Sequence, residues 1–302
     1  MRKLSIVVVG VSAFTSVVWA NSVTLNPDQD NILGESTTGA ISNALGDIFV
    51  GGTSQTGPAR RGVVRFDITS AGIPTGSTIN SVTLRLWLAK TGDTSIRSIS
   101  VHRATADWGE GSSYFNGGIG TSSTTNDATW IHEFYSSTFW TASGGDFNSS
   151  SGSANVGSAG SVDQWYTWSS AGMKSDVQAW IASPSTNYGW VLIGSAESTS
   201  QTARRFTSRE SVDDAGAHFP ELVIDYTPPP GFAGGKAKTR TTTQIAGLRL
   251  LGERDLDGDG VADLLLRDDS RHILLGGHQT RDGLVTWELA LDHTSDDPLA
   301  IH

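Results

Sequence analysis

The chain has 302 residues, of which 35 are glycine, ten are tryptophan and none is cysteine. The absence of cysteine excludes disulfide frameworks, cysteine-ligated metal centres and cysteine nucleophiles. The 31 acidic and 21 basic side chains leave a formal net charge of −10, which argues against nucleic-acid binding because that function depends on neutralising phosphates.

The first predicted element is a secretory signal peptide at Met1–Ala20. Arg2 and Lys3 form a short basic start, an apolar stretch follows, and Val18-Trp19-Ala20 places small residues at the two positions that a signal peptidase reads. The alternative is a transmembrane anchor, which needs roughly 20 apolar residues, more than this interrupted stretch provides. We therefore expect a secreted protein, extracellular or at the cell surface, whose mature chain has no membrane span.

Residues 21–228 are predicted to form a β domain, because apolar and polar side chains alternate along several short segments. In the segment 78–88 one face is apolar throughout, namely Val82, Leu84, Leu86 and Leu88. In the segment 62–68 the expected inward residues are Val64, Phe66 and Ile68, and the expected outward residues include Val63. Turns with glycine and proline separate these segments, and their spacing suits an antiparallel two-sheet sandwich.

Two segments of this domain depart from the alternation. Between residues 170 and 182 apolar side chains recur at helical spacing, Ser169 or Ser170 is placed to cap the start, and Pro184 stops continuation. One short helix is therefore predicted on the end of the sandwich. The tract 109–162 is long, rich in glycine, serine, threonine and asparagine, and carries several aromatic residues, which is typical of a functional or binding loop.

Several phrases of the sequence carry a family resemblance. They include Arg60–Asp67, Ala106–Gly111, Asp127–Trp130 and Arg205–Glu210, and they occur in order along the chain. With these phrases the segment 23–228 resembles the DNRLRE-domain family, exported bacterial β-sandwiches that are grouped with carbohydrate-binding modules. The resemblance implies a jelly-roll-like sandwich, a non-catalytic role and recognition of acidic polysaccharide of the alginate type.

Two residue types are candidates for contacting a polysaccharide, since sugar rings stack on flat aromatic side chains and uronic carboxylates pair with arginine. The aromatic candidates, which lie among polar residues, are Trp130, Trp140, Trp165 and Trp168. The basic candidates, which lie near the starts of predicted strands, are Arg60, Arg61, Arg204 and Arg205. The alternative interpretation is that the rings fill the core and that arginines make internal ion pairs, as we expect for Arg65 with Asp67 and for Arg209 with Glu210.

A linker at residues 229–244 is predicted to precede a small C-terminal module, residues 245–302. The acidic loop of this module places oxygen ligands at alternate positions, namely Asp255, Asp257, Asp259, the carbonyl of Val261, and Asp263. Calcium takes roughly six to eight oxygen ligands, and an EF-hand would add a glutamate where Leu266 stands. The loop instead resembles the β-hairpin calcium loop of FG-GAP or integrin-like repeats, so we expect Ca²⁺ as a cofactor. The alternative is a solvated acidic turn.

The sequence carries no nucleophile elbow, zinc-protease motif or phosphate loop, so we expect a protein that is not an enzyme. The expected fold is all-β, an antiparallel jelly-roll-like β-sandwich with one short helix, followed by a small C-terminal β-hairpin module. The expected function is recognition of an extracellular or cell-surface polysaccharide, with an acidic polymer as the leading candidate. The alternative is a structural subunit of an extracellular layer or fibre, because a lone repeat offers strand edges for self-association.

Overall fold

The computed structural model describes residues 21–211 and 218–229, together with four C-terminal strands at residues 248–254, 263–268, 273–279 and 285–292. The predicted signal peptide and nearly all of the predicted linker lie outside the described residues. The chain divides into two compact units, one ending at Pro228 and the other beginning at Pro229. Among the helices in the described part, none has the length and apolar character needed to cross a membrane.

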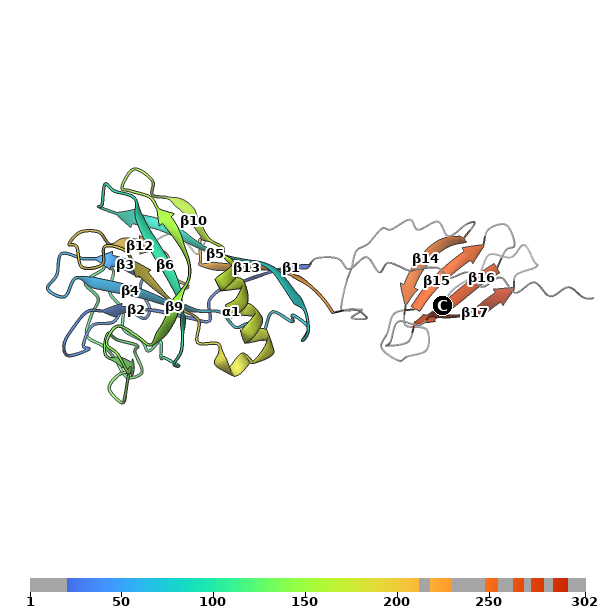
Figure 1. Ribbon diagram of the computed structural model, residues 1–302, viewed down its shortest axis with the longest axis horizontal. Helices are drawn as coiled ribbons and strands as arrows, with labels where there is room; N and C mark the ends of the chain where they lie inside the picture. Colours follow the sequence, from blue (N-terminus) through green and yellow to red (C-terminus); the bar gives the residue numbers. More distant parts are fainter. Residues whose placement is uncertain are drawn as a thin grey trace, which may run out of the picture. The chain divides into compact units, whose positions relative to one another are not determined.

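The first unit is an all-β fold with one short helix (Figure 1). In chain order its strands are β1 (Asn21–Leu25), β2 (Gln29–Gly34), β3 (Ile48–Gly52), β4 (Ala59–Arg65), β5 (Thr78–Thr91), β6 (Arg97–Ala104), β7 (His132–Phe134), β8 (Thr138–Phe139), β9 (Phe147–Val156), β10 (Gln164–Trp168), β11 (Trp190–Gly194), β12 (Arg204–Phe206) and β13 (Glu221–Thr227). The helix α1 (Ala171–Ala182) and the 3₁₀ turn η1 (Pro184–Thr186) lie between β10 and β11.

Eleven of these strands form one antiparallel sheet that curls around a common core. The order is β1-β13-β5-β12-β3-β4-β11-β6-β9, with β10 added beside β5 and β2 beside β4. The hairpin β3–β4, in which Gly51 pairs with Arg60 and Gly52 with Ala59, joins the two parts of the sheet. This arrangement is consistent with the predicted β-sandwich. The short strands β7 and β8 form a separate hairpin.

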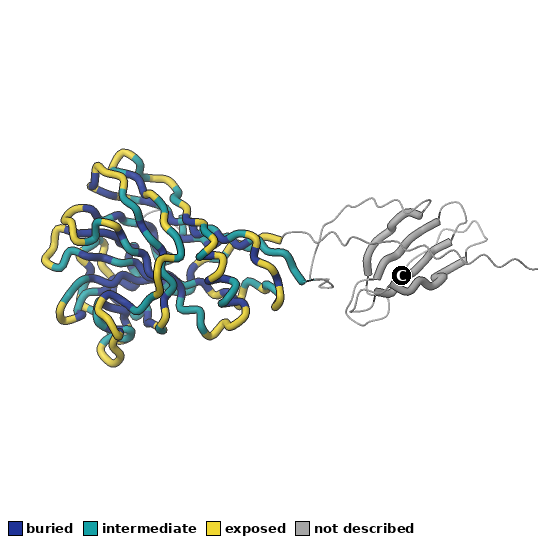
Figure 2. The backbone as a smooth tube through the Cα atoms, viewed as in Figure 1, coloured by how far each residue is buried: buried dark blue, intermediate teal, exposed yellow. Residues whose placement is uncertain are grey.

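The main core lies between the two parts of the curled sheet. The four apolar residues predicted to face inward from β5 are all buried, which confirms the face assigned to that strand. Trp168, Trp180 and Trp190 join the same cluster, as do Val64 and Phe66. Figure 2 shows that buried residues follow the strands of this unit, whereas exposed residues are concentrated in the connections between them.

A second apolar cluster covers the opposite face of β4 and β11. Val63, which was expected to point outward, is fully buried there beside Val191. The residues that cover them include Trp108, Ala128 and Trp140, all between residues 104 and 147. Much of the tract predicted as a loop therefore packs as a core layer, and its last part forms the sheet strand β9.

The helix α1 follows the predicted boundaries. The hydroxyl of Ser170 accepts a hydrogen bond from the backbone N–H of Met173 at 3.1 Å, which caps the first turn. The same hydroxyl donates to the carbonyl of Ser151 in β9 at 2.5 Å. Because α1 contacts both β5 and β9, it closes the side of the sandwich between these two strands.

The second unit contains a four-stranded antiparallel sheet where a hairpin module was predicted. Its strands are β14 (Leu248–Arg254), β15 (Asp263–Asp268), β16 (Ile273–Gln279) and β17 (Val285–Asp292), and they are adjacent in this order. Arg254 pairs with Asp263, so the chain between β14 and β15 connects two neighbouring antiparallel strands. The predicted calcium ligands Asp255, Asp257, Asp259 and Val261 lie in this connection, outside the described residues.

Candidate functional site

Two of the four predicted tryptophans lie in the core. Trp168 is 0% exposed and Trp140 is 6% exposed. The ring N–H of Trp168 donates to the carbonyl of Ile99, and that of Trp140 to the carbonyl of Thr129, both at 2.8 Å. The sequence singled out both rings as candidate surface platforms, but the structure places them inside the protein. Their burial is tolerated because each ring N–H has a backbone carbonyl as its hydrogen-bond partner.

Two of the four predicted arginines are also buried. Arg60 is 0% exposed, and its guanidinium donates to four backbone carbonyls, those of Gly57, Ala59, Gly118 and Ile119. Arg204 is 1% exposed, pairs with Asp93 at 3.2 Å, and donates to the carbonyls of Ser95, Gly157 and Thr202. Burial lowers the pKa of both guanidinium groups, in Arg60 to about 10. These arginines tie loops to the sheet and present no group to a ligand.

Trp165 belongs to an aromatic cluster on β5 and β10. It pairs with Trp87 across the strands, with ring centroids 5.6 Å apart. His218 stacks on Trp87 at 3.6 Å, and the guanidinium of Arg85 lies 4.5 Å from the Trp165 ring centroid. Protein groups therefore already cover a face of each ring.

Trp130 and Arg61 form another cluster, over the part of the sheet that contains β4. The guanidinium of Arg61 lies 4.8 Å from the Trp130 ring centroid and makes two hydrogen bonds with Glu197, at 2.7 and 3.0 Å. Its third donor reaches the carbonyl of Gly144 at 2.8 Å. The four predicted tryptophans are thus divided between the core and two surface clusters, and they do not line a common groove.

Arg205, the last predicted arginine, lines a surface groove with residues that the sequence did not single out. The groove consists of two hollows of about 490 and 340 Å³ that share Phe49, Gly92, Gly118 and Ala203. The register of three neighbouring strands brings the lining residues of the groove together. Arg205 of β12 pairs with Lys90 of β5 on one side and with Phe49 of β3 on the other. Directly paired residues of antiparallel strands project from the same face. We call the two hollows together the basic groove.

The chemistry of the basic groove suits a polar, negatively charged chain. Lys90 is exposed, and Arg205 is held by an ion pair with Asp47 at 3.3 Å. No aspartate or glutamate is among the residues that line the two hollows, whereas Gln55, Asn116 and Gln201 supply exposed amides. Ile119, which lines the smaller hollow, is 49% exposed, and Tyr114 and Phe115, which precede the lining residue Asn116, are 54% and 41% exposed.

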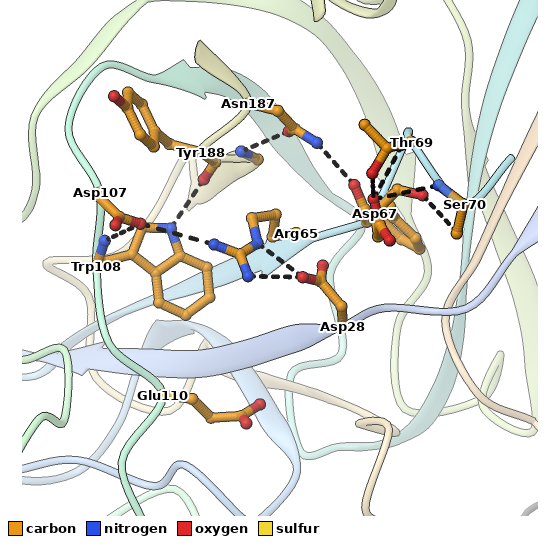
Figure 3. Close-up of polar contacts among 12 residues, drawn as sticks. Asp28, Arg65, Asp67, Thr69, Ser70, Asp107, Trp108, Glu110, Asn187 and Tyr188 are labelled. Atoms are coloured by element: carbon orange, nitrogen blue, oxygen red, sulfur yellow. Dashed lines mark hydrogen bonds and ion pairs between the residues drawn. The ribbon is translucent and has the colours of Figure 1, made fainter. Parts of the chain in front are cut away.

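A second cleft, of about 370 Å³, has the opposite charge (Figure 3). Arg65 donates to Asp28 at 2.9 and 2.6 Å and lies 3.6 Å from Asp107, so its partners differ from the predicted Asp67. Asp67 instead accepts hydrogen bonds from Thr69 and Ser70, and the Thr69 side chain is the main cause of its lowered pKa. Three carboxylates and a single guanidinium line this acidic cleft, which makes it unsuitable for a uronic polymer.

The described residues contain no group of three histidine, aspartate or glutamate side chains arranged to hold a metal ion. Comparison of the chain with protein-family models and with curated proteins finds no match to either. The resemblance to the DNRLRE-domain family and to FG-GAP repeats therefore stays a prediction, and the functional argument depends on the geometry of the grooves.

Proposed function

We propose that the sandwich is a non-catalytic carbohydrate-binding domain that holds an acidic polysaccharide of the cell surface or extracellular matrix in the basic groove. The observation that carries this proposal is the pairing of Lys90 with Arg205 at the floor of a groove that no carboxylate lines. A role outside the cell is part of the same proposal.

Each part of the groove has a function in this proposal. Uronic carboxylates pair with the Lys90 ammonium and the Arg205 guanidinium, whose orientation the ion pair with Asp47 fixes. Sugar hydroxyls need hydrogen-bond partners, which Gln55, Asn116 and Gln201 supply. The glycines of the floor allow close approach of a sugar ring, and the exposed ring of Phe115 offers a stacking surface at the rim.

The test is affinity gel electrophoresis of the full chain in gels that contain polyuronate, a neutral glucan or no polymer. We expect polyuronate alone to retard the protein. Lys90→Gln should weaken this binding roughly fivefold, since an exposed ion pair contributes about 1 kcal/mol. The matched control is Lys174→Gln, which removes an exposed lysine of α1 outside the groove.

The outcomes separate the proposed function from its alternatives. Retardation by no polymer contradicts carbohydrate binding, and fibres seen by electron microscopy in the same preparation would support the structural-subunit alternative. Equal loss of binding in Lys90→Gln and Lys174→Gln would show that general charge, and not the groove, holds the polymer. Release of oligosaccharides from any polymer would contradict the non-catalytic role.

We also propose that the connection between β14 and β15 binds Ca²⁺ through Asp255, Asp257, Asp259, the carbonyl of Val261, and Asp263. The support is the spacing of these oxygen ligands and the antiparallel pairing of the flanking strands. When bound, Ca²⁺ would offset two of the four carboxylate charges and fix the connection between the two strands.

A further inference from the structure

A group of carboxylates near the basic groove has no part in the proposed binding. Asp30 of β2 is fully buried and accepts a hydrogen bond from the backbone N–H of Arg209 at 2.9 Å. Arg209 donates to both carboxylate oxygens of Glu110, at 2.9 and 2.7 Å, and lies 2.5 Å from Glu210. The predicted pair of Arg209 with Glu210 is therefore present, but it is part of a cluster in which two carboxylates contact one guanidinium and a third, Asp30, accepts from the backbone of the same arginine.

One positive charge does not balance three negative charges in this partly buried cluster, where the side chain of Arg209 is 35% exposed and that of Glu210 is 21% exposed. One oxygen of Asp30 and one of Glu210 are buried and accept no hydrogen bond within the described part of the chain. Burial, followed by the charge of Glu210, raises the pKa of Asp30 well above its ordinary value. Burial, followed by the charge of Glu110, raises the pKa of Glu210 to about 7. Glu210 therefore changes its charge near neutral pH.

Glu210 is separated from the basic groove by one short segment, residues 114–116. Glu210 lines a cavity of about 20 Å³ together with Tyr114, Phe115 and Asn116, and Asn116 also lines the basic groove. The backbone N–H of Phe115 donates to the side-chain oxygen of Asn43 at 2.7 Å, which holds the segment in place.

Among the described residues, the charged groups around Glu210 come from several segments of the chain. Asp30, Glu110 and Arg209 form the cluster already described. Asp47 lines the same cavity and pairs with Arg205 at 3.3 Å, and Tyr114 is the other ionisable side chain among the described residues that line it. Because the pKa of Glu210 is about 7, a shift of one pH unit to either side of neutrality changes the charge of this carboxyl.

We propose that Glu210 is a pH switch for the basic groove, and this inference rests on the proposed binding function. Protonated Glu210 carries no charge and leaves the segment 114–116 packed against it. Ionised Glu210 adds a second negative charge, beside Glu110, on the single guanidinium of Arg209, at a cavity that has room for about one water molecule. Because a half-buried charge needs more hydration than a neutral carboxyl, further water enters, the segment 114–116 moves, and the groove loses affinity for polysaccharide.

The first experiment measures polyuronate affinity of the native chain and of Glu210→Gln between pH 5.5 and pH 8.5 at fixed ionic strength. If only the protonated form binds, native affinity falls about tenfold from pH 6 to pH 8, in proportion to the protonated fraction. Glu210→Gln should keep its pH 6 affinity at pH 8. The control Asp107→Asn, which removes an exposed carboxylate of the acidic cleft, should follow the native curve.

The second experiment measures hydrogen exchange of the Phe115 amide, corrected for its intrinsic rate. We expect its protection to fall above pH 7 in the native chain and to stay constant in Glu210→Gln. This measurement requires no polysaccharide, so it tests movement of the segment even where the binding assay fails.

Each outcome distinguishes the switch from the binding function. Absence of polyuronate binding at every pH contradicts the proposed function, while the exchange data still decide the movement of residues 114–116. Equal affinity at pH 6 and pH 8 overturns the switch and leaves binding intact. A parallel fall in Glu210→Gln assigns the pH dependence to another group. A difference between the two proteins that disappears in high salt would show long-range charge repulsion and would also overturn the switch.

Discussion

Replacing Arg60 by methionine tests whether this buried guanidinium stabilises the sandwich or contacts a ligand. In the structure it donates to the carbonyls of Gly57, Ala59, Gly118 and Ile119. Methionine has similar length but no donor, so the carbonyls of Gly57, Gly118 and Ile119 lose their hydrogen bonds to Arg60, whereas the carbonyl of Ala59 still accepts from the backbone N–H of Glu35. A buried polar group without a partner costs about 1–3 kcal/mol.

Taking the lower end of that range for each of these three carbonyls, we expect Arg60→Met to lower the free energy of unfolding by roughly 3 kcal/mol. For a domain of this size the melting temperature should then fall by roughly 10 °C. Urea and thermal unfolding of the full chain, followed by tryptophan fluorescence, measure both quantities.

The control is Arg103→Met, at a half-buried arginine that makes one hydrogen bond, to Thr186 at 3.1 Å. Its free energy of unfolding should change by less than about 1 kcal/mol. The reasoning is refuted if Arg60→Met unfolds like the native chain and has lost polysaccharide binding, because Arg60 would then be the ligand residue that the sequence predicted.

Three further predictions concern stability. The pKa of Glu210 is about 7 in the folded protein against an ordinary value of 4.5, so ionisation destabilises the fold as pH rises through this interval. In denaturation series at pH 5 and pH 8, Glu210→Gln should remove up to about 3 kcal/mol of this loss, and identical pH profiles would contradict the assignment. Ser170→Ala should lower the free energy of unfolding by about 1 kcal/mol through loss of the helix cap, whereas Ser175→Ala, at an exposed position of the same helix, should not. Calcium should raise the melting temperature of the native chain over that in chelator, and Asp257→Asn should reduce this shift; an equal shift in both proteins would count against the predicted calcium loop.

The strand faces and the helix could be predicted because their signals are local. Alternation along β5 reports directly which side chains are buried, and Ser170 lies beside the turn that it caps. Val63 shows the limit of this reasoning. Val63 is buried because a covering layer that includes Trp108 and Trp140 packs on its face of the sheet. The alternation of apolar and polar residues along a strand does not reveal whether the second face of the sheet is also covered.

Whether a predicted ligand residue is buried or exposed depends on hydrogen-bond partners far away in the chain. Trp168 donates to Ile99, which is 69 positions away, and Arg204 donates to Ser95, which is 109 positions away. The basic groove has the same origin, because Lys90, Arg205 and Phe49 meet only through the register of β5, β12 and β3. Composition and spacing identified the residue types that bind sugars, but not which of them the fold buries.

The contact between α1 and β9 has a consequence for aggregation. β9 is the last strand in the sheet order, and none of its ten residues is charged, so it lacks the lysine or proline that usually protects such an edge. The helix start protects it instead. The Ser170 hydroxyl binds the Ser151 carbonyl, and Gly172 lies so close that a Cβ there would be 2.2 Å from the same oxygen. A foreign strand that pairs with the middle of β9 must first displace this helix, so α1 limits growth of the sheet into amyloid-like stacks.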